Sequence, residues 1–228
     1  MAVVDVLEYF GCKVDFPEGQ TCCGQPQFNN GYPEQARGLA LRMIRVFADS
    51  THVVTPSGSC CAMIRDHYPA LFKDSAEETD ALAFVAKTYE FVEFLTKILK
   101  VDVNGLALPK ETSLTYHYTC HTRGLGLKES AGSSTIDIVR KLRNARFVPL
   151  EKAEQCCGFG GTFAVKFSEI SGAMAADKVK CGEASGAQVM IVNDAGCAMN
   201  IGGACRRKGG AFAVKHIAEV LAEAVGRK

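Results

Sequence analysis

The sequence predicts an α/β fold of two pseudo-repeated halves, each a mostly parallel, Rossmann-like sheet with helices on its faces. Two observations predict this fold. The motif Cys-Cys-Gly occurs twice, ending at Gly24 and at Gly158, and after each copy helical patterns alternate in the same order with short β-branched strands. Such alternation is typical of parallel strands that are joined by helical crossovers.

Length and composition describe a globular protein. The chain has 228 residues, of which 47% are hydrophobic and 22% charged. Its formal net charge of +1 gives no reason to expect nucleic acid or anionic membrane as a partner. No apolar run approaches the length of a membrane span, and the first residues lack the basic and then apolar pattern of an export signal. We therefore expect a cytoplasmic protein with no membrane span.

Each repeat is expected to open with a short amphipathic helix that leads into an apolar strand. These strands are predicted at Lys13–Phe16 in the first half and at Arg146–Pro149 in the second. The Cys-Cys-Gly turn follows four or five residues later in both halves. Because a turn rich in glycine interrupts both helix and strand, it separates this opening unit from the next.

A helix and a second strand follow each Cys-Cys-Gly turn. The helices are predicted at Pro33–Ser50 and Gly161–Ser185, and the strands at His52–Thr55 and Gln188–Val192. Each strand ends at a turn of small residues, and each turn carries the next cysteine of its half. These cysteines therefore lie at the carboxyl ends of strands, where α/β sheets carry their functional loops.

A third correspondence closes each half, because Phe91–Leu95 resembles Ile217–Leu221. Glycine and proline in Asn104–Lys110 predict a linker, so we divide the chain into residues 1–105 and 111–228. The second half opens with a predicted strand, Ser113–Tyr118, that leads to Cys120. The first half has no equivalent strand and no equivalent cysteine, so we expect it to be incomplete at its N-terminal side.

The cysteines predict metal or redox chemistry. There are eleven of them, an odd number, and a reducing compartment does not favour a disulfide framework. Thiolates are soft ligands that suit iron–sulfur clusters, zinc or cuprous copper. The second half offers four, enough for a four-iron cluster: Cys120, Cys156, Cys157 and Cys197. Zinc is a weaker alternative, because no pair has the short spacing that is common in zinc sites.

Glycines and histidines around these cysteines are candidate cofactor-binding residues. Gly158 and Gly160 allow the backbone to approach closely and to direct N–H groups at cluster sulfurs, and Gly24 is the equivalent of Gly158. The same glycine-rich turn before a helix could cradle a phosphate, although it fits neither a P-loop nor a dinucleotide fingerprint. His117 and His121 flank Cys120, and we expect them to orient its loop rather than to act as ligands.

The remaining cysteines have simpler interpretations. Cys12, Cys181 and Cys205 are expected to be small buried hydrophobic residues. Cys61 adjoins Cys60 and has three candidate roles. It is a structural residue, or it supplements the first-half site, or, if it is exposed with a low pKa, it acts as the reactive thiol of a thiol–disulfide reductase.

Taken together, the motifs resemble those of the duplicated cysteine-rich (CCG) domain family. This family includes a cysteine-rich subunit of heterodisulfide reductase, the glycolate oxidase iron–sulfur subunit and the lactate-utilisation iron–sulfur proteins, and the chain looks most like the last group. The resemblance covers essentially the whole chain and lies in five motifs: Thr21-Cys22-Cys23-Gly24-Gln25-Pro26, Thr55-Pro56-Ser57-Gly58-Ser59-Cys60, Tyr116-His117-Tyr118-Thr119-Cys120-His121, Cys156-Cys157-Gly158-Phe159-Gly160-Gly161-Thr162-Phe163 and Gly196-Cys197. Family members normally begin with a further strand and cysteine.

The resemblance implies an iron–sulfur subunit that transfers electrons released when L-lactate is oxidised to pyruvate. It implies a ferredoxin-like iron–sulfur subunit and other lactate-utilisation subunits as partners. It also implies a [4Fe–4S] cluster on the four second-half cysteines and a second site, short of one thiolate, on Cys22, Cys23 and Cys60. Heterodisulfide reductases carry a further cysteine where this chain has Met63 and Asn200, so their chemistry has less support. A glycolate-oxidase-like subunit and a zinc-stabilised interaction scaffold also stay open as interpretations.

Overall fold

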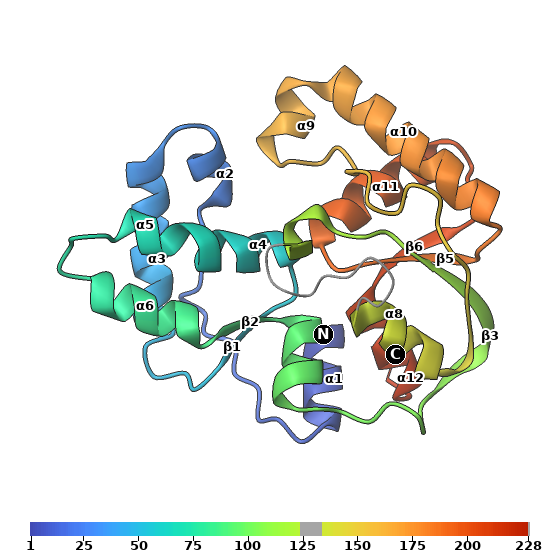
Figure 1. Cartoon of the computed structure of the whole chain (residues 1–228), viewed down its shortest axis with the longest axis horizontal. Coiled ribbons are helices and arrows are strands. Elements are labelled where there is room, and N and C mark those ends of the chain that lie inside the picture. Colours follow the sequence, from blue (N-terminus) through green and yellow to red (C-terminus); the bar gives the residue numbers. More distant parts are fainter. Residues whose placement is uncertain (124–133, 228) are drawn as a thin grey trace.

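Two parallel sheets organise the chain, and helices flank them (Figure 1). The computed structural model describes residues 1–123 and 134–227. Within this part, one sheet has the order β1-β2 and the other the order β4-β3-β5-β6, and every pairing is parallel. The predicted α/β class with parallel strands is confirmed.

The elements have the following bounds. The strands are β1 (Val53–Thr55), β2 (Thr88–Glu90), β3 (Ala107–Tyr116), β4 (Arg143–Phe147), β5 (Val189–Val192) and β6 (Ala213–His216). The helices of the first half are α1 (Ala2–Tyr9), α2 (Gln25–Asn29), α3 (Pro33–Val46), α4 (Gly58–Ala62), α5 (Tyr68–Leu71), α6 (Glu78–Ala86) and α7 (Phe91–Glu93), with π-helical turns η1 (Met63–His67) and η2 (Phe94–Ile98). Those of the second half are the 3₁₀ turn η3 (Cys120–Arg123), α8 (Ser134–Lys141), α9 (Thr162–Lys166), α10 (Ser168–Ser185), α11 (Ala195–Arg207) and α12 (Ile217–Ala224).

The internal repeat is visible where each half closes. β2 leads into α7 just as β6 leads into α12, and a capping box begins both helices. Glu90 and Glu93 form the first box, and His216 and Glu219 form the second at the same relative positions. Such boxes satisfy N–H groups that a helix leaves without partners at its start. The predicted correspondence between Phe91–Leu95 and Ile217–Leu221 is therefore confirmed.

The opening of each half differs from the prediction. No strand forms at Lys13–Phe16, where the chain is irregular and the Phe16 side chain is 73% exposed. A strand needs a neighbour to pair its backbone groups, and within the described residues β1 pairs only with β2. The equivalent strand in the second half does form, as β4, but it begins three residues before the predicted Arg146.

Two further predicted boundaries were wrong. β3 begins at Ala107, inside the predicted linker Asn104–Lys110, because Leu106 and Leu108 are buried in the main core and draw this segment into the sheet. The predicted helix Gly161–Ser185 is two helices, α9 and α10, which Phe167 separates in a non-helical conformation.

The main hydrophobic core is built from both halves. Val6 and Leu7 of α1 lie in the same buried cluster as Ile217 and Leu221 of α12, and the two helices pack together. Phe91 of the first half also belongs to this cluster. The two halves therefore share a core, although the sequence divides between residues 105 and 111. Among the described residues, no helix is long and apolar enough to span a membrane.

The carboxyl ends of the two sheets meet in a reciprocal junction. The Gly58 N–H donates to the Asn193 carbonyl at 3.2 Å, and the His216 Nε2–H donates to the Pro56 carbonyl at 2.7 Å. Conversely, the Asn193 amide donates to Glu90 Oε1 at 3.3 Å. Pro56 and Asn193 are equivalent in the repeat, as are Glu90 and His216, so equivalent ends of each half contact the other half.

Candidate metal centre

Cys120 and Cys197 follow the two central strands of the four-stranded sheet, and Cys156 and Cys157 follow its edge strand β4. From β3 the chain passes through α8 to β4 on one side, and from β5 through α11 to β6 on the other. The boundary between β3 and β5 is thus the topological switch point, where open α/β sheets bind ligands beyond the carboxyl ends of their strands. Cys120 begins η3 after β3, and Cys197 lies in the first turn of α11 after β5.

The structure brings the four second-half thiols together. Cys157 Sγ lies 3.3 Å from Cys197 Sγ, and Cys156 is hydrogen-bonded to both Cys157 and Cys120. The four sulfurs therefore form a continuous chain of contacts, although they come from three separate segments of sequence. Hydrogen bonding with Cys120 and Cys157 holds the pKa of Cys156 far below its usual range, and the same contacts raise the pKa values of Cys120 and Cys157.

Backbone N–H groups point at these sulfurs. The Gly158 N–H donates to Cys156 Sγ at 3.4 Å, and the Phe159 N–H bonds to Cys157. In the first half the Gln25 N–H bonds to Cys23 in the same way. Hydrogen bonds of this kind stabilise thiolates and help to set the potential of a bound cluster.

The backbone of each Cys-Cys-Gly turn adopts a left-handed conformation that favours glycine. Gly24 and Gly158 have φ values of +86° and +83°, which L-residues with a Cβ rarely adopt. A Cβ at Gly24 would lie 3.0 Å from the Ala36 carbonyl oxygen, and one at Gly158 would lie 2.9 Å from that of Ser171. The first turn is thus pressed against the backbone of α3 and the second against that of α10. Gly160 shapes the turn before α9 through its own positive φ of +52°.

His117 is buried among the thiols. One of its ring nitrogens and the sulfurs of Cys157 and Cys197 lie within 4.8 Å of one another. Neither nitrogen has a hydrogen-bond partner with normal geometry, although the Ala153 carbonyl lies nearby, and burial lowers the pKa of His117 to about 3. A neutral buried imidazole can bind a metal ion through its unprotonated nitrogen or hydrogen-bond to a bound group. His121 is exposed, with Nδ1 3.6 Å from Cys120 Sγ.

Sequence reasoning missed a buried lysine and an amide at this site. Lys178 of α10 is 0% exposed and donates through Nζ to the carbonyls of Lys152 and Ala153. Burial lowers its pKa, while the nearby sulfurs of α10 and of the second-half site favour its charged form. Lys178 follows Ser171 and Ala175 on the buried face of the helix, so helical periodicity could have identified it. Asn200 donates to the Cys157 carbonyl at 2.8 Å.

The first-half cysteines form a smaller group. The Cys23 thiol hydrogen-bonds to Cys60 and thereby lowers the pKa of Cys60 to about 7. Cys22 is exposed beside them and acts on Cys23 electrostatically. The Tyr68 hydroxyl donates to the Cys23 carbonyl at 2.9 Å and fixes this turn.

The other four cysteines are buried or partly buried. Cys181 and Cys205 are buried, as predicted, and Cys12 is partly buried. Cys61 is 0% exposed, and burial raises its pKa to about 12. An exposed thiol with a low pKa, which a thiol–disulfide reductase requires, is therefore not found at this position, and that expectation is wrong.

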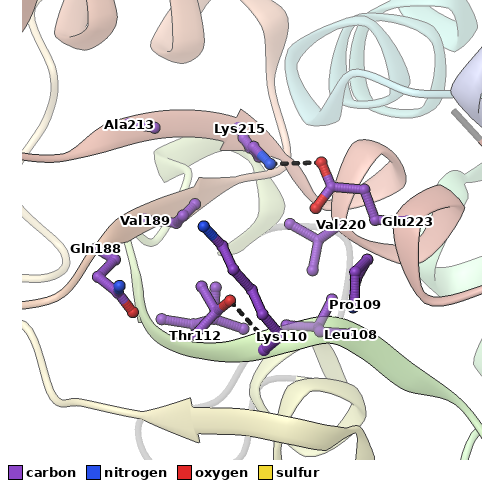
Figure 2. A pocket seen from close by; sticks show the side chains of 11 residues that line it. Leu108, Pro109, Lys110, Thr112, Gln188, Val189, Ala213, Lys215, Val220 and Glu223 are labelled. Carbon is purple, nitrogen blue, oxygen red and sulfur yellow. Dashed lines mark hydrogen bonds and ion pairs between the residues drawn. The ribbon is translucent and has the colours of Figure 1, made fainter.

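A pocket of about 400 Å³ lies at the amino-terminal ends of the strands of the four-stranded sheet (Figure 2). It is bordered by the first residues of strands, Val189 and Ala213, whereas the cysteines follow the ends of strands. The Lys110 side chain extends across it, and Lys215 forms an ion pair with Glu223 at its rim. None of the cysteines lines this pocket, so it is separate from the thiol site.

The chain matches one protein-family model and is similar to several named proteins. A family model described as "CCG: Cysteine-rich domain" matches residues 1–65 and 114–202. The chain is similar to "Lactate utilization protein A" of Geobacillus kaustophilus (strain HTA426), with 47% identity over 96% of this chain and 90% of the relative. It is likewise 46% identical to the protein of that name from Bacillus subtilis (strain 168), again over 96% and 90%. For Shouchella clausii (strain KSM-K16) the identity is 48%, over 96% and 89%.

Proposed function

The chain belongs to the CCG cysteine-rich domain family, and from this we propose that it is an iron–sulfur electron-transfer subunit of lactate utilisation. The observation that carries the proposal is the convergence of four thiols at the switch point of the sheet. Four soft ligands in one place suit a cluster with four protein ligands.

The residues of the second-half site fit a [4Fe–4S] cluster. Cys120, Cys156, Cys157 and Cys197 would hold it, and a bound cluster would supply one-electron redox chemistry. The Gly158 N–H already donates to a sulfur, and His117 offers a buried nitrogen that lacks a normal hydrogen bond. We propose that His117 and His121 orient the site, as Gly158 and Gly160 do through the backbone.

The first half is proposed to hold a second, less complete centre. Cys22, Cys23 and Cys60 would supply three thiolates from the equivalent turn and helix, with Gly24 in the role of Gly158. The first-half centre would lie in residues 1–105 and the second-half centre in residues 111–228. In this arrangement each half contributes one site at the carboxyl end of its sheet.

We assign the chain to the oxidation of L-lactate to pyruvate because its relatives carry the name "Lactate utilization protein A". That oxidation releases two electrons and two protons. The described thiol site contains sulfur ligands and a histidine with a depressed pKa, which suit electron transfer better than proton abstraction. Substrate oxidation and further electron transfer are therefore assigned to companion subunits, including a ferredoxin-like iron–sulfur protein.

Replacement of Cys157 by serine tests the proposal. The Cys157→Ser variant should lose the visible absorbance of the cluster and lactate-dependent electron transfer together, when it is assayed with its companion subunits after anaerobic isolation. Cys181→Ala, at a buried cysteine that is not among the proposed ligands, should retain both. Full lactate-dependent activity in Cys157→Ser would contradict the site assignment.

Zinc is the second candidate, favoured by the group of His117, Cys157 and Cys197. Sulfur and imidazole nitrogen are the usual ligands of structural zinc sites. A zinc-stabilised scaffold would have no redox role. X-ray absorption at the iron and zinc edges of freshly isolated protein separates the two, because only one metal would show sulfur ligation.

A further inference from the structure

One carboxylate caps two helices that belong to different halves. Asp194 is the N-cap residue of α11, is 5% exposed, and accepts the Gly196 N–H through Oδ1 at 2.9 Å. Its second oxygen, Oδ2, accepts the Ser59 N–H at 3.0 Å and the Ser57 hydroxyl at 2.7 Å. Gly196 and Ser59 each occupy the second position of their helix, where an N-cap side chain normally binds.

The first-half helix has no cap of its own. Ser57 stands at the N-cap of α4, in the position equivalent to Asp194, but its side chain caps none of the N–H groups of α4. Instead, the Ser57 hydroxyl donates to the carboxylate of the second half. The helical segment that begins at Gly58 continues through η1 and α5 to Leu71, so this single carboxylate serves a segment of three connected elements.

Both helices carry cysteines one residue beyond the capped N–H. Cys60 follows Ser59 in α4, and Cys197 follows Gly196 in α11. The junction around them is tightly packed, because a Cβ at Gly58 would lie 2.7 Å from Thr122 Cγ2 in the turn that carries Cys120. A shift of α4 would therefore disturb both halves.

We propose that Asp194 is a positioning residue that holds Cys60 and Cys197, and with them the two cysteine sites, in one fixed relation. The functional importance of this relation rests on the proposed electron-transfer function, since electron transfer between two centres falls off steeply with their separation. The structural part of the proposal does not depend on it. Removal of the carboxylate frees the first turns of both α4 and α11, because charged hydrogen bonds to helix N–H groups are lost at both.

Alkylation of individual cysteines in the metal-free full chain tests the shared cap. The probe is iodoacetamide, and the rate at each cysteine is followed by mass spectrometry of the peptides. Asp194→Ala should speed the modification of Cys60 and of Cys197 by about fivefold each, the factor that corresponds to the loss of a cap of about 1 kcal/mol. Cys181 and Cys205, which are buried away from the junction, report global unfolding and should not change.

Three further variants separate the effect of the shared cap on α4 from its effect on α11. Ser57→Ala should speed the modification of Cys60 alone when rates are compared at a pH where the Cys60 thiol is fully ionised, because the Ser57 hydroxyl also hydrogen-bonds to Cys60 and lowers its pKa. Asp194→Asn keeps one carbonyl oxygen for its own helix but places an amide donor toward the first half, so Cys60 should react faster while Cys197 stays near its wild-type rate. Asp177→Ala, at an exposed aspartate of α10, should leave all four rates unchanged.

Two results would overturn the proposal: faster modification of Cys197 but not Cys60 in Asp194→Ala, or an unchanged Cys60 rate in Ser57→Ala. If Asp194→Ala unfolds, all four cysteines react faster together, and Ser57→Ala then decides. Failure of the proposed function would be seen separately, as an absence of iron and sulfide from the wild-type chain. The labelling pattern is therefore independent of that outcome.

Discussion

Lys178 brings a buried positive charge to the second-half sulfurs. Its side chain is held by the Lys152 and Ala153 carbonyls, and its charged form is favoured by Cys156, Cys157 and Cys197. A buried ammonium is expensive unless it is hydrogen-bonded and balanced by negative charge. Its retention at 0% exposure is therefore explained by the two carbonyl hydrogen bonds and by the negative charge that thiolates place beside it.

The charge of Lys178 should set the potential of the site. Reduction adds negative charge, which a nearby cation stabilises, so Lys178→Met should shift the midpoint potential of the cluster to a more negative value. The measurement is a redox titration followed by electron paramagnetic resonance. Lys180→Met is the matched control, because Lys180 is exposed on the same helix and should have no effect. Equal potentials in Lys178→Met and the wild type would contradict this role.

Glu90 should make the stability of the junction depend on pH. Burial raises its pKa from an ordinary 4.5 to about 7, despite hydrogen bonds from the Val92 and Glu93 N–H groups. Because the folded state binds the proton more tightly, the stabilisation is fully present below the unfolded pKa and is lost as pH rises through 7. The change is on the order of 3 kcal/mol across this window.

Glu90→Gln removes the titrating group and keeps an acceptor for the cap. Its free energy of unfolding, from urea titrations at pH 5 and pH 8, should vary less with pH than that of the wild type. Glu111→Gln, at an exposed glutamate of β3, should keep the wild-type dependence. An identical pH dependence in Glu90→Gln and the wild type would show that the Glu90 carboxyl does not titrate in this range.

At the scale of elements, the two Cys-Cys-Gly turns depend on their glycines. Gly158→Ala should lower the iron content and the free energy of unfolding, because alanine is strained at a φ of +83° and its Cβ would press on the Ser171 carbonyl. Gly172→Ala is the control in the interior of α10, with open space around the Cβ. It should be neutral or stabilise the fold by about 0.5–1 kcal/mol. Wild-type iron content in Gly158→Ala would contradict the requirement.

Local sequence patterns predicted elements with strong periodicity and failed where tertiary contacts decide. The strand at Val53–Thr55 and the helix from Pro33 lie where β-branched and amphipathic patterns predicted them. Lys13–Phe16 has the same kind of pattern but remains irregular, because a strand requires a partner that its own sequence does not specify. The predicted linker became part of β3 because its leucines are buried by residues from distant elements.

At the scale of the whole molecule, the internal repeat predicted which cysteines come together in the second half. It did not predict the junction between the carboxyl ends of the two sheets. Equivalent spacings in the two halves indicated which cysteines lie at strand ends, and parallel strands bring those ends together. The contact between Ser57 and Asp194 joins residues 137 positions apart and has no local signal. The same is true of the core that α1 and α12 share across the two halves.

The most direct test of the central claim is an assay of iron, zinc and acid-labile sulfide in the full chain after anaerobic isolation. A [4Fe–4S] cluster on the second-half cysteines predicts iron and sulfide in equal amounts, about four of each per chain, with more if the first-half site is also filled. Zinc without sulfide in freshly isolated protein would contradict the proposed electron-transfer function.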